Sequence, residues 1–206
     1  MKVVIDDGST VMTKKAEDAL VDYVKEGGKL ILFVTSGQRT LGSDGEYNLL
    51  HRLGYKDTAS LLKRRHDSAM LVLSAKNPVL ARTAPLPLNK IAALEVPKGG
   101  TILGRVKTDT GAVLWPFGKG QVVLIGGVPG SVTEDQIQEL WSGKTREEKK
   151  KAGPLWSSSE RELGAVTAAI TRDAAEWAGV KPQFSLPDRF RSCLKREGDK
   201  TLVYMY

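Results

Sequence analysis

The fold of this chain is decided between residues 23 and 37, which read YVKEGGKLILFVTSG. The first residues of this stretch close a helix, and the glycine pair at 27–28 ends it. Residues 30–34 then form an apolar run typical of a strand buried on both faces. The turn at 35–37 follows, where an α/β enzyme places its reactive group. It holds neither cysteine nor histidine, so the stretch predicts a catalytic scaffold without a catalyst.

The preceding segment completes a βαβ unit. Residues 3–5 are a short apolar run, which indicates another buried strand. Residues 13–26 carry apolar side chains at helical spacing, with Thr13 placed to cap the helix start and Gly27 to cap its end. A strand, a helix and a strand joined by short turns favour a right-handed crossover between parallel strands.

The second half of the chain has a different pattern. A strand is expected at 69–73, and helices at 46–53, 133–141 and 158–178, the last with a capping box from Ser159 to Glu162. After Pro87, short antiparallel strands are predicted at 91–96, 101–106, 112–115 and 121–125, with turns at 109–111 and 118–120 and a final hairpin near 197–200. The expected fold class is therefore α/β, an open and mainly parallel sheet with antiparallel strands in the second half.

Composition sets limits on function. The 206 residues are 41% hydrophobic and 27% charged, enough for one sizeable core. No apolar run approaches the length of about 18 residues that suggests a membrane helix, so no membrane partner is expected. Cys193 is the single cysteine, which excludes an intrachain disulfide and a multi-cysteine zinc site. Nothing in the composition assigns a compartment.

The net charge of +7 raises the question of nucleic acid. The cations gather at 63–66 and at 144–151. The second run is interrupted by two acids, as in a solvated helix face, and neither run has interleaved aromatic residues for base stacking. We expect no nucleic-acid partner, with polyanion binding as the weaker alternative.

Candidate ligand-binding residues follow the two predicted parallel strands. Asp6 and Asp7 end the first strand, and Thr35, Ser36 and Gln38 follow the second. Ligands of open α/β sheets bind at this carboxyl edge, although acids there also stabilise helix starts. Ser36 lacks the flanking glycines of a nucleophile elbow, so a turn-forming serine is the main interpretation.

The two histidines do not suggest a metal site. His51 lies on the helix predicted at 46–53 beside Arg52, and His66 follows three cations that favour its neutral form. His51 is interpreted as a surface histidine, and His66 has no visible acidic partner. We therefore expect no catalytic residue, no metal ligand and no cofactor in this chain.

Four stretches resemble a known family. They are residues 6–37 with their Tyr-Val-x-x-Gly-Gly-x-Leu core, 115–126 with a Gly-Lys-Gly turn, 177–182, and 191–206. Together they resemble the class I glutamine-amidotransferase-like fold, and more narrowly the trimerisation domain of glycoside hydrolase family 42 β-galactosidases. This resemblance implies a flavodoxin-like α/β domain over 1–186 that lacks its first strand–helix unit, and the start of a following β-domain over 187–206.

The resemblance also implies a function. True amidotransferases carry a reactive cysteine in the turn after the second strand, and this chain has Val34, Thr35 and Ser36 there. The β-galactosidase domains share this loss, since their chemistry resides in a separate barrel. We therefore expect a non-catalytic domain of a larger carbohydrate-active enzyme that forms a homo-oligomer, a trimer by resemblance, and walls a neighbouring active site.

Two alternatives of other classes stay open. One is a small-molecule or sugar-binding module that uses the loops at 6–10 and 35–42, which keeps carbohydrate as a candidate partner. The other is a hydrolase with Ser36 as an unconventional nucleophile. A binding module is stabilised by its ligand, whereas an association domain assembles as its concentration rises.

Overall fold

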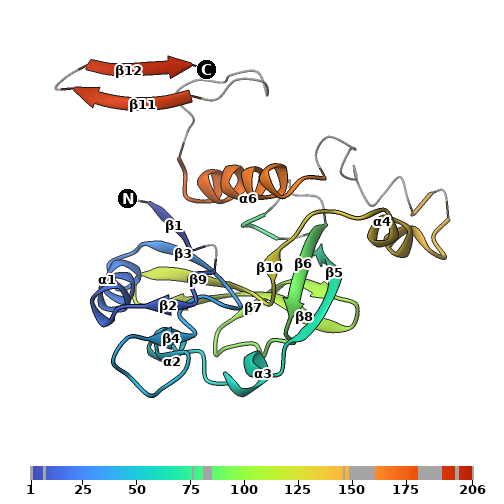
Figure 1. Cartoon of the computed structure of the whole chain (residues 1–206), viewed down its shortest axis with the longest axis horizontal. Helices are drawn as coiled ribbons and strands as arrows, with labels where there is room; N and C mark the ends of the chain where they lie inside the picture. Colours follow the sequence, from blue (N-terminus) through green and yellow to red (C-terminus); the bar gives the residue numbers. More distant parts are fainter. Residues whose placement is uncertain are drawn as a thin grey trace.

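The computed structural model describes residues 2–6, 8–75, 77–80, 85–145, 147–148, 161–180, 192–197 and 200–205. Its centre is an eight-stranded sheet (Figure 1). The strand order is β1 (Val3–Asp6), β3 (Lys29–Phe33), β9 (Gly120–Ile125), β8 (Asp109–Phe117), β7 (Thr101–Val106), β5 (Arg65–Leu73), β6 (Leu86–Ile91) and β10 (Val128–Pro129). Two smaller sheets pair β2 (Val11–Met12) with β4 (Arg39–Thr40), and β11 (Ser192–Glu197) with β12 (Lys200–Met205).

The α/β class is confirmed, but the expected mainly parallel sheet is wrong. Within the eight-stranded sheet only β1–β3 and β3–β9 pair in parallel, and the other five neighbouring pairs are antiparallel. The sheet is therefore mixed, mostly antiparallel and strongly curled (Figure 1). The physical reason is connectivity. Parallel neighbours need a long crossover such as the helix between β1 and β3, whereas β7, β8 and β9 are joined by tight turns that reverse the chain.

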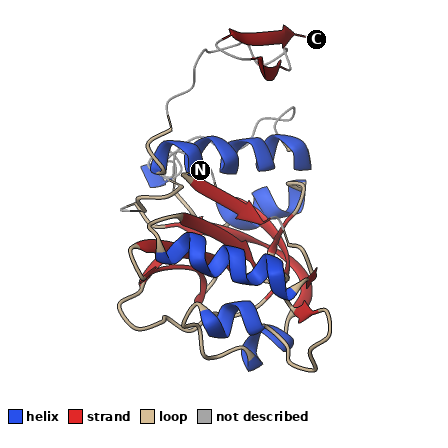
Figure 2. Cartoon of the chain, turned by 90° about the vertical axis from the view of Figure 1, so that its left-hand side faces the viewer, coloured by secondary structure: helices blue, strands red, loops and turns tan. Residues whose placement is uncertain are grey.

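Helices cover both faces of the parallel end of the sheet (Figure 2). On β3, Ile31 and Phe33 face the core shared with α6 (Leu163–Trp177), and Leu30 and Leu32 face the core shared with α1 (Lys14–Lys25). Side chains on a strand alternate between faces, so a continuous apolar run is what a doubly covered strand requires. This confirms the buried strand predicted from residues 30–34.

The predicted boundaries of α1 are confirmed. The Thr13 hydroxyl accepts a hydrogen bond from the Ala16 amide at 3.2 Å, which satisfies a free amide of the first turn. Gly27 follows the helix with φ of 113°, a left-handed conformation that glycine adopts without steric cost. The cap at Thr13 and the left-handed Gly27 therefore set the two ends of the helix in the βαβ unit, as the sequence predicts.

Other helices match their predictions in part. The helix expected at 46–53 is present as α2 (Asn48–Arg52), shorter because Tyr47 is left-handed with φ of 56°. The helix expected at 133–141 is α4 (Glu134–Trp141), with a capping box between Thr133 and Gln136. The long helix begins at Leu163 rather than at residue 158, and Ser159 lies outside the described residues. A short helix, α3 (Ala59–Leu62), was not predicted.

Two predictions in the antiparallel half are wrong. The strand expected at 91–96 lies earlier, as β6, because residues after Ile91 leave the ladder: the amides of Ala92 and Leu94 donate to the carbonyls of Gly126 and Thr110 instead. The turn expected at 109–111 lies at residues 107–108, so 109–111 belong to β8. The strands expected at 69–73, 101–106, 112–115 and 121–125 are present, several of them longer, and so are the turn at 118–120 and the strands of the final hairpin.

The Gly-Lys-Gly turn packs against the end of α1. A Cβ atom on Gly120 would lie 2.2 Å from the carbonyl oxygen of Gly28 and 2.3 Å from that of Val24. The Lys119 amide donates to the Lys25 carbonyl at 3.0 Å, and the Gln121 amide to the Gly28 carbonyl at 3.2 Å. Only glycine permits this approach, which docks the start of β9 on the helix end.

Replacing Gly120 tests this contact. We expect Gly120→Ala to lower the free energy of unfolding by about 2 to 3 kcal/mol, because the methyl group forces two backbone segments apart. The matched control is Gly164→Ala in α6, where an added Cβ meets no atom within 4 Å. The control should raise stability by about 0.5 to 1 kcal/mol through helix propensity. Urea unfolding of both variants checks the pair, and equal effects would contradict the close approach.

Candidate functional site

The predicted ligand residues gather where β1 and β3 end. Asp6 is the last residue of β1 and pairs in register with Leu32, so the loops that follow the two strands lie side by side. We call Asp6, Thr35, Ser36 and Gln38 the strand-end cluster. Asp7, the fifth predicted residue, lies outside the described residues.

Ser36 is a structural residue in this geometry. Its side chain is completely buried, and its hydroxyl accepts from the Phe33 amide at 3.0 Å and donates to the Asp6 carbonyl at 3.2 Å. A nucleophilic serine instead needs an open approach and a base within hydrogen-bond reach. The hydroxyl of Ser36 therefore joins the ends of β1 and β3.

Asp6 and Thr35 also bind the loop backbone. The Asp6 carboxylate accepts from the Ser9 amide at 3.1 Å, and the Thr35 hydroxyl donates to the Gly8 carbonyl at 3.1 Å. Gly8 has φ of 111°, and a Cβ atom there would lie 2.5 Å from the Thr35 hydroxyl oxygen. Within the described ranges, no group of three or more histidine, cysteine, aspartate or glutamate side chains is placed to hold a metal ion.

Gln38 belongs to a network that the sequence did not reveal. Its side-chain oxygen accepts from the Arg64 guanidinium at 3.0 Å, and the same guanidinium donates to the Tyr47 hydroxyl at 3.0 Å. The Tyr47 hydroxyl donates in turn to the Val34 carbonyl at 3.0 Å, and burial raises the pKa of this phenol, which keeps it neutral. These partners are 17 and 26 residues apart in the chain, so no local spacing could have found them.

A second network missed from the sequence holds the loop at 35–42. Glu17, on the first turn of α1, is only 1% exposed, and its carboxylate accepts from the Thr40 hydroxyl at 2.5 Å. The Asn48 amide donates to the same hydroxyl at 3.1 Å, and Arg52 pairs with Asp18 at 2.7 Å and approaches Glu17 at 3.8 Å. A buried carboxylate needs such partners, so this network fixes the loop to α1.

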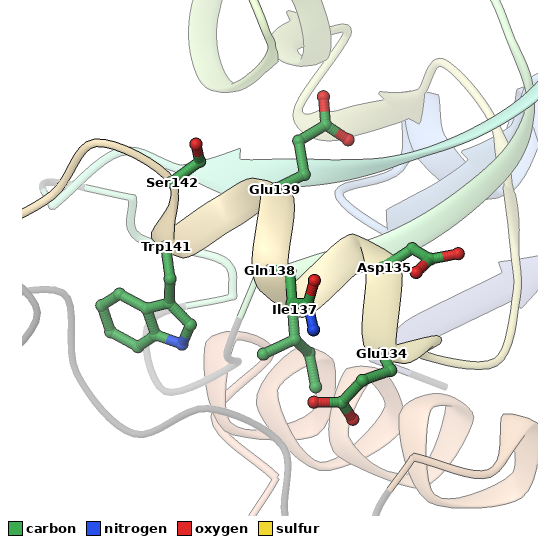
Figure 3. A pocket seen from close by; sticks show the side chains of 7 residues that line it. All are labelled: Glu134, Asp135, Ile137, Gln138, Glu139, Trp141 and Ser142. Carbon is green, nitrogen blue, oxygen red and sulfur yellow. The ribbon is translucent and has the colours of Figure 1, made fainter.

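Surface hollows occur away from the strand-end cluster. One runs along α4 and the residue after it, with side chains drawn in Figure 3: Glu134, Asp135, Ile137, Gln138, Glu139, Trp141 and Ser142. The second lies beside the end of α1, between Gly28, Lys29 and Ala178. Neither hollow includes a predicted ligand residue.

No family model and no curated protein matches the sequence. Among solved structures, a cold-adapted β-galactosidase from Rahnella sp. R3 matches 99% of this chain at 11% identity with a TM-score of 0.65. The chain has the fold of a β-galactosidase domain.

A second β-galactosidase structure extends this finding. The β-galactosidase from Bacillus circulans sp. alkalophilus matches 99% of the chain at 14% identity with a TM-score of 0.62. Gan42B, a GH42 β-galactosidase, matches 76% of the chain at 18% identity, with a TM-score of 0.45. The chain spans about a quarter of the first two enzymes, 27% and 26% of their lengths. The resemblance expected from the sequence is therefore confirmed as a likeness of fold.

No described helix combines the length and apolar character that a membrane crossing requires.

The role of Ser36 can be tested by removing its hydroxyl. We expect Ser36→Ala to destabilise the fold by about 1 to 2 kcal/mol, since two buried hydrogen bonds are lost. Ser9→Ala is the matched control in the same loops. Ser9 is exposed, and its hydrogen bonds to Asp6 and Gly37 are made by its backbone amide and carbonyl rather than by its hydroxyl. Urea unfolding measures both. Esterase or glycosidase turnover that disappears in Ser36→Ala with stability unchanged would instead support the serine hydrolase alternative.

Proposed function

We propose that this chain is a non-catalytic, amidotransferase-like domain of a larger carbohydrate-active enzyme of the β-galactosidase kind, and that it mediates association of subunits. The observation that carries the proposal is the fold likeness, which covers 99% of this chain but about a quarter of each matched enzyme. In each of these enzymes, about three quarters of the length lies outside this part. The cleavage of β-galactosides would then use acids outside this chain.

The strand-end cluster supports the non-catalytic part. Its hydroxyl groups bond to backbone atoms within the cluster and its loops, and Ser36, the one candidate nucleophile, is buried. An active elbow presents its nucleophile at the top of the sheet, open to substrate. The same edge that holds a reactive residue in an enzyme here holds two loops together.

Exposed apolar side chains support the association part. Val11 on β2 is 52% exposed, and Leu41, just after β4, is 63% exposed. The Leu41 amide donates to the Met12 carbonyl at 2.8 Å, so both side chains belong to one small ribbon, with the exposed Arg39 opposite Val11 in register. An obligate assembly buries roughly 2,000 Å² or more, and such a ribbon would form part of that area.

The domain division is part of the same proposal. Residues 1–186 would form the association domain and 187–206 the start of a following β-domain. In support, β11 and β12 pair with each other, and among the described strands neither joins the eight-stranded sheet. A trimer that walls a neighbouring active site is the arrangement that the resemblance implies.

Light-scattering chromatography across a wide range of protein concentration tests association. We expect a defined assembly, and Leu41→Glu should weaken it by about tenfold or more because an apolar contact is replaced by a charge. Val96→Glu is the matched control, since Val96 is 43% exposed and, like Leu41, lies outside the strands.

A monomer at every concentration would contradict the association proposal. The small-molecule or sugar-binding alternative would then be favoured. Thermal stabilisation of the protein by added galactosides would test that alternative.

A further inference from the structure

We propose that Arg64 is a preorganised binding site for a carboxylate group, held in position by Tyr47 and Gln38 beside the strand-end cluster. The site is independent of the proposed function, because it stands on the geometry of one side chain. Its ligand chemistry is a planar oxyanion, supplied either by a small carboxylic acid or by an aspartate or glutamate of a second copy of the chain.

The guanidinium of Arg64 is fixed by two neutral acceptors. One terminal nitrogen donates to the Tyr47 hydroxyl and the other to the Gln38 side-chain oxygen, each at 3.0 Å. These acceptors are fixed in turn, since the Tyr47 hydroxyl donates to the Val34 carbonyl and the Tyr47 amide donates to the Gln38 carbonyl at 2.9 Å. A long, flexible side chain is thereby ordered before any ligand arrives, which lowers the entropic cost of binding.

The positive charge of Arg64 is not neutralised within the described chain. A guanidinium has five N–H donors, and two are used here by uncharged partners. By contrast, Arg52 pairs with Asp18 at 2.7 Å and Arg161 pairs with Glu134. Among the described residues Arg64 makes no such ion pair, so its remaining donors and its charge are available to an anion.

Charges of both signs lie near Arg64. Burial raises the pKa of the Tyr47 phenol, Arg64 lowers it and Glu46 raises it, so Glu46 also acts on this phenol, although among the described residues it makes no ion pair with Arg64. Lys63, the exposed neighbour in the chain, adds a second positive charge.

Tyr47 carries an unusual backbone. It is fully buried and left-handed, with φ of 56°, a conformation that few residues other than glycine adopt. Such conformations persist where the surrounding structure requires a particular placement, and they concentrate at functional sites. Here the placement puts the phenol between the Val34 carbonyl and the Arg64 guanidinium.

The ligand class follows from the shape of the group. The planar fork of arginine matches a carboxylate with two parallel hydrogen bonds, which lysine cannot reproduce. Arg64 is half-buried and lines neither of the two hollows described above. The site therefore receives one exposed carboxylate group, rather than enclosing a whole molecule.

Nuclear magnetic resonance of arginine side chains tests the site directly. Sodium acetate is titrated into ¹⁵N-labelled protein against sodium chloride of equal ionic strength, and the Arg64 Nε–H signal is assigned by its loss in Arg64→Gln. We expect a saturable shift of that signal. In Arg64→Lys, acetate binding is followed through the backbone amide signals of Gln38 and Tyr47. Acetate should bind at least about tenfold more weakly to this variant, because lysine keeps the positive charge but lacks the planar guanidinium group.

Arg105→Gln is the matched control. Arg105 is an exposed arginine on β7 whose side chain donates to the Thr108 carbonyl at 3.0 Å, so its loss removes the same charge elsewhere. Acetate binding at Arg64 should be unchanged in this variant. A shift of Arg64 that is absent, or no larger than that of Arg105, would overturn the proposal and leave Arg64 as a brace for Tyr47 and Gln38.

The source of the carboxylate is distinguished by light scattering on the same variants. Weaker assembly in Arg64→Gln and in acetate, but not in Arg105→Gln, would identify an acidic side chain of a second copy. Acetate binding with assembly unchanged would identify a small carboxylic acid. A protein that is monomeric throughout contradicts the association function but leaves the acetate result intact, so the two proposals fail separately.

Discussion

The close approach of two glycine-containing turns is the constraint on which the rest of the fold depends. Gly120 lies against the carbonyl groups of Gly28 and Val24 at distances that no Cβ atom permits. This contact sets the register in which Lys29 faces Gln121 across β3 and β9. Because β9 pairs in parallel with β3 and antiparallel with β8, the same contact joins the two halves of the sheet. A βαβ unit and an antiparallel meander thereby share a core on each face of the sheet.

The carboxyl edge of the parallel strands is held together by hydrogen bonds between its loops. Enzymes of α/β type leave polar groups at this edge open to a ligand. Here Ser36 and Thr35 bond to the backbone of the neighbouring loop, and Glu17 holds Thr40. These side chains hold the loops together. Arg64 is the exception, because its partners are neutral and its charge has no counterpart among the described residues.

Local features were predictable because their causes lie within a few residues. The Thr13 cap, the left-handed Gly27 and the buried strand from residue 30 all rest on neighbours in the chain. The sheet direction was not predictable in the same way. An apolar run suits a strand of either direction, and the tight turns that make most pairs antiparallel were partly misplaced, as at residues 107–108.

The sequence by itself determined that this is an α/β chain with a βαβ start, a strand-end cluster and no cysteine or histidine at the expected nucleophile position. Only the tertiary structure decided that the sheet is mostly antiparallel, that Ser36 is buried, and that Arg64 meets Tyr47 and Gln38 across 17 and 26 residues. The physical reason is how far apart in the chain the interacting residues lie. Caps and turns are set by adjacent dihedral angles and hydrogen bonds, whereas strand partners and side-chain networks form between segments that meet only when the core packs.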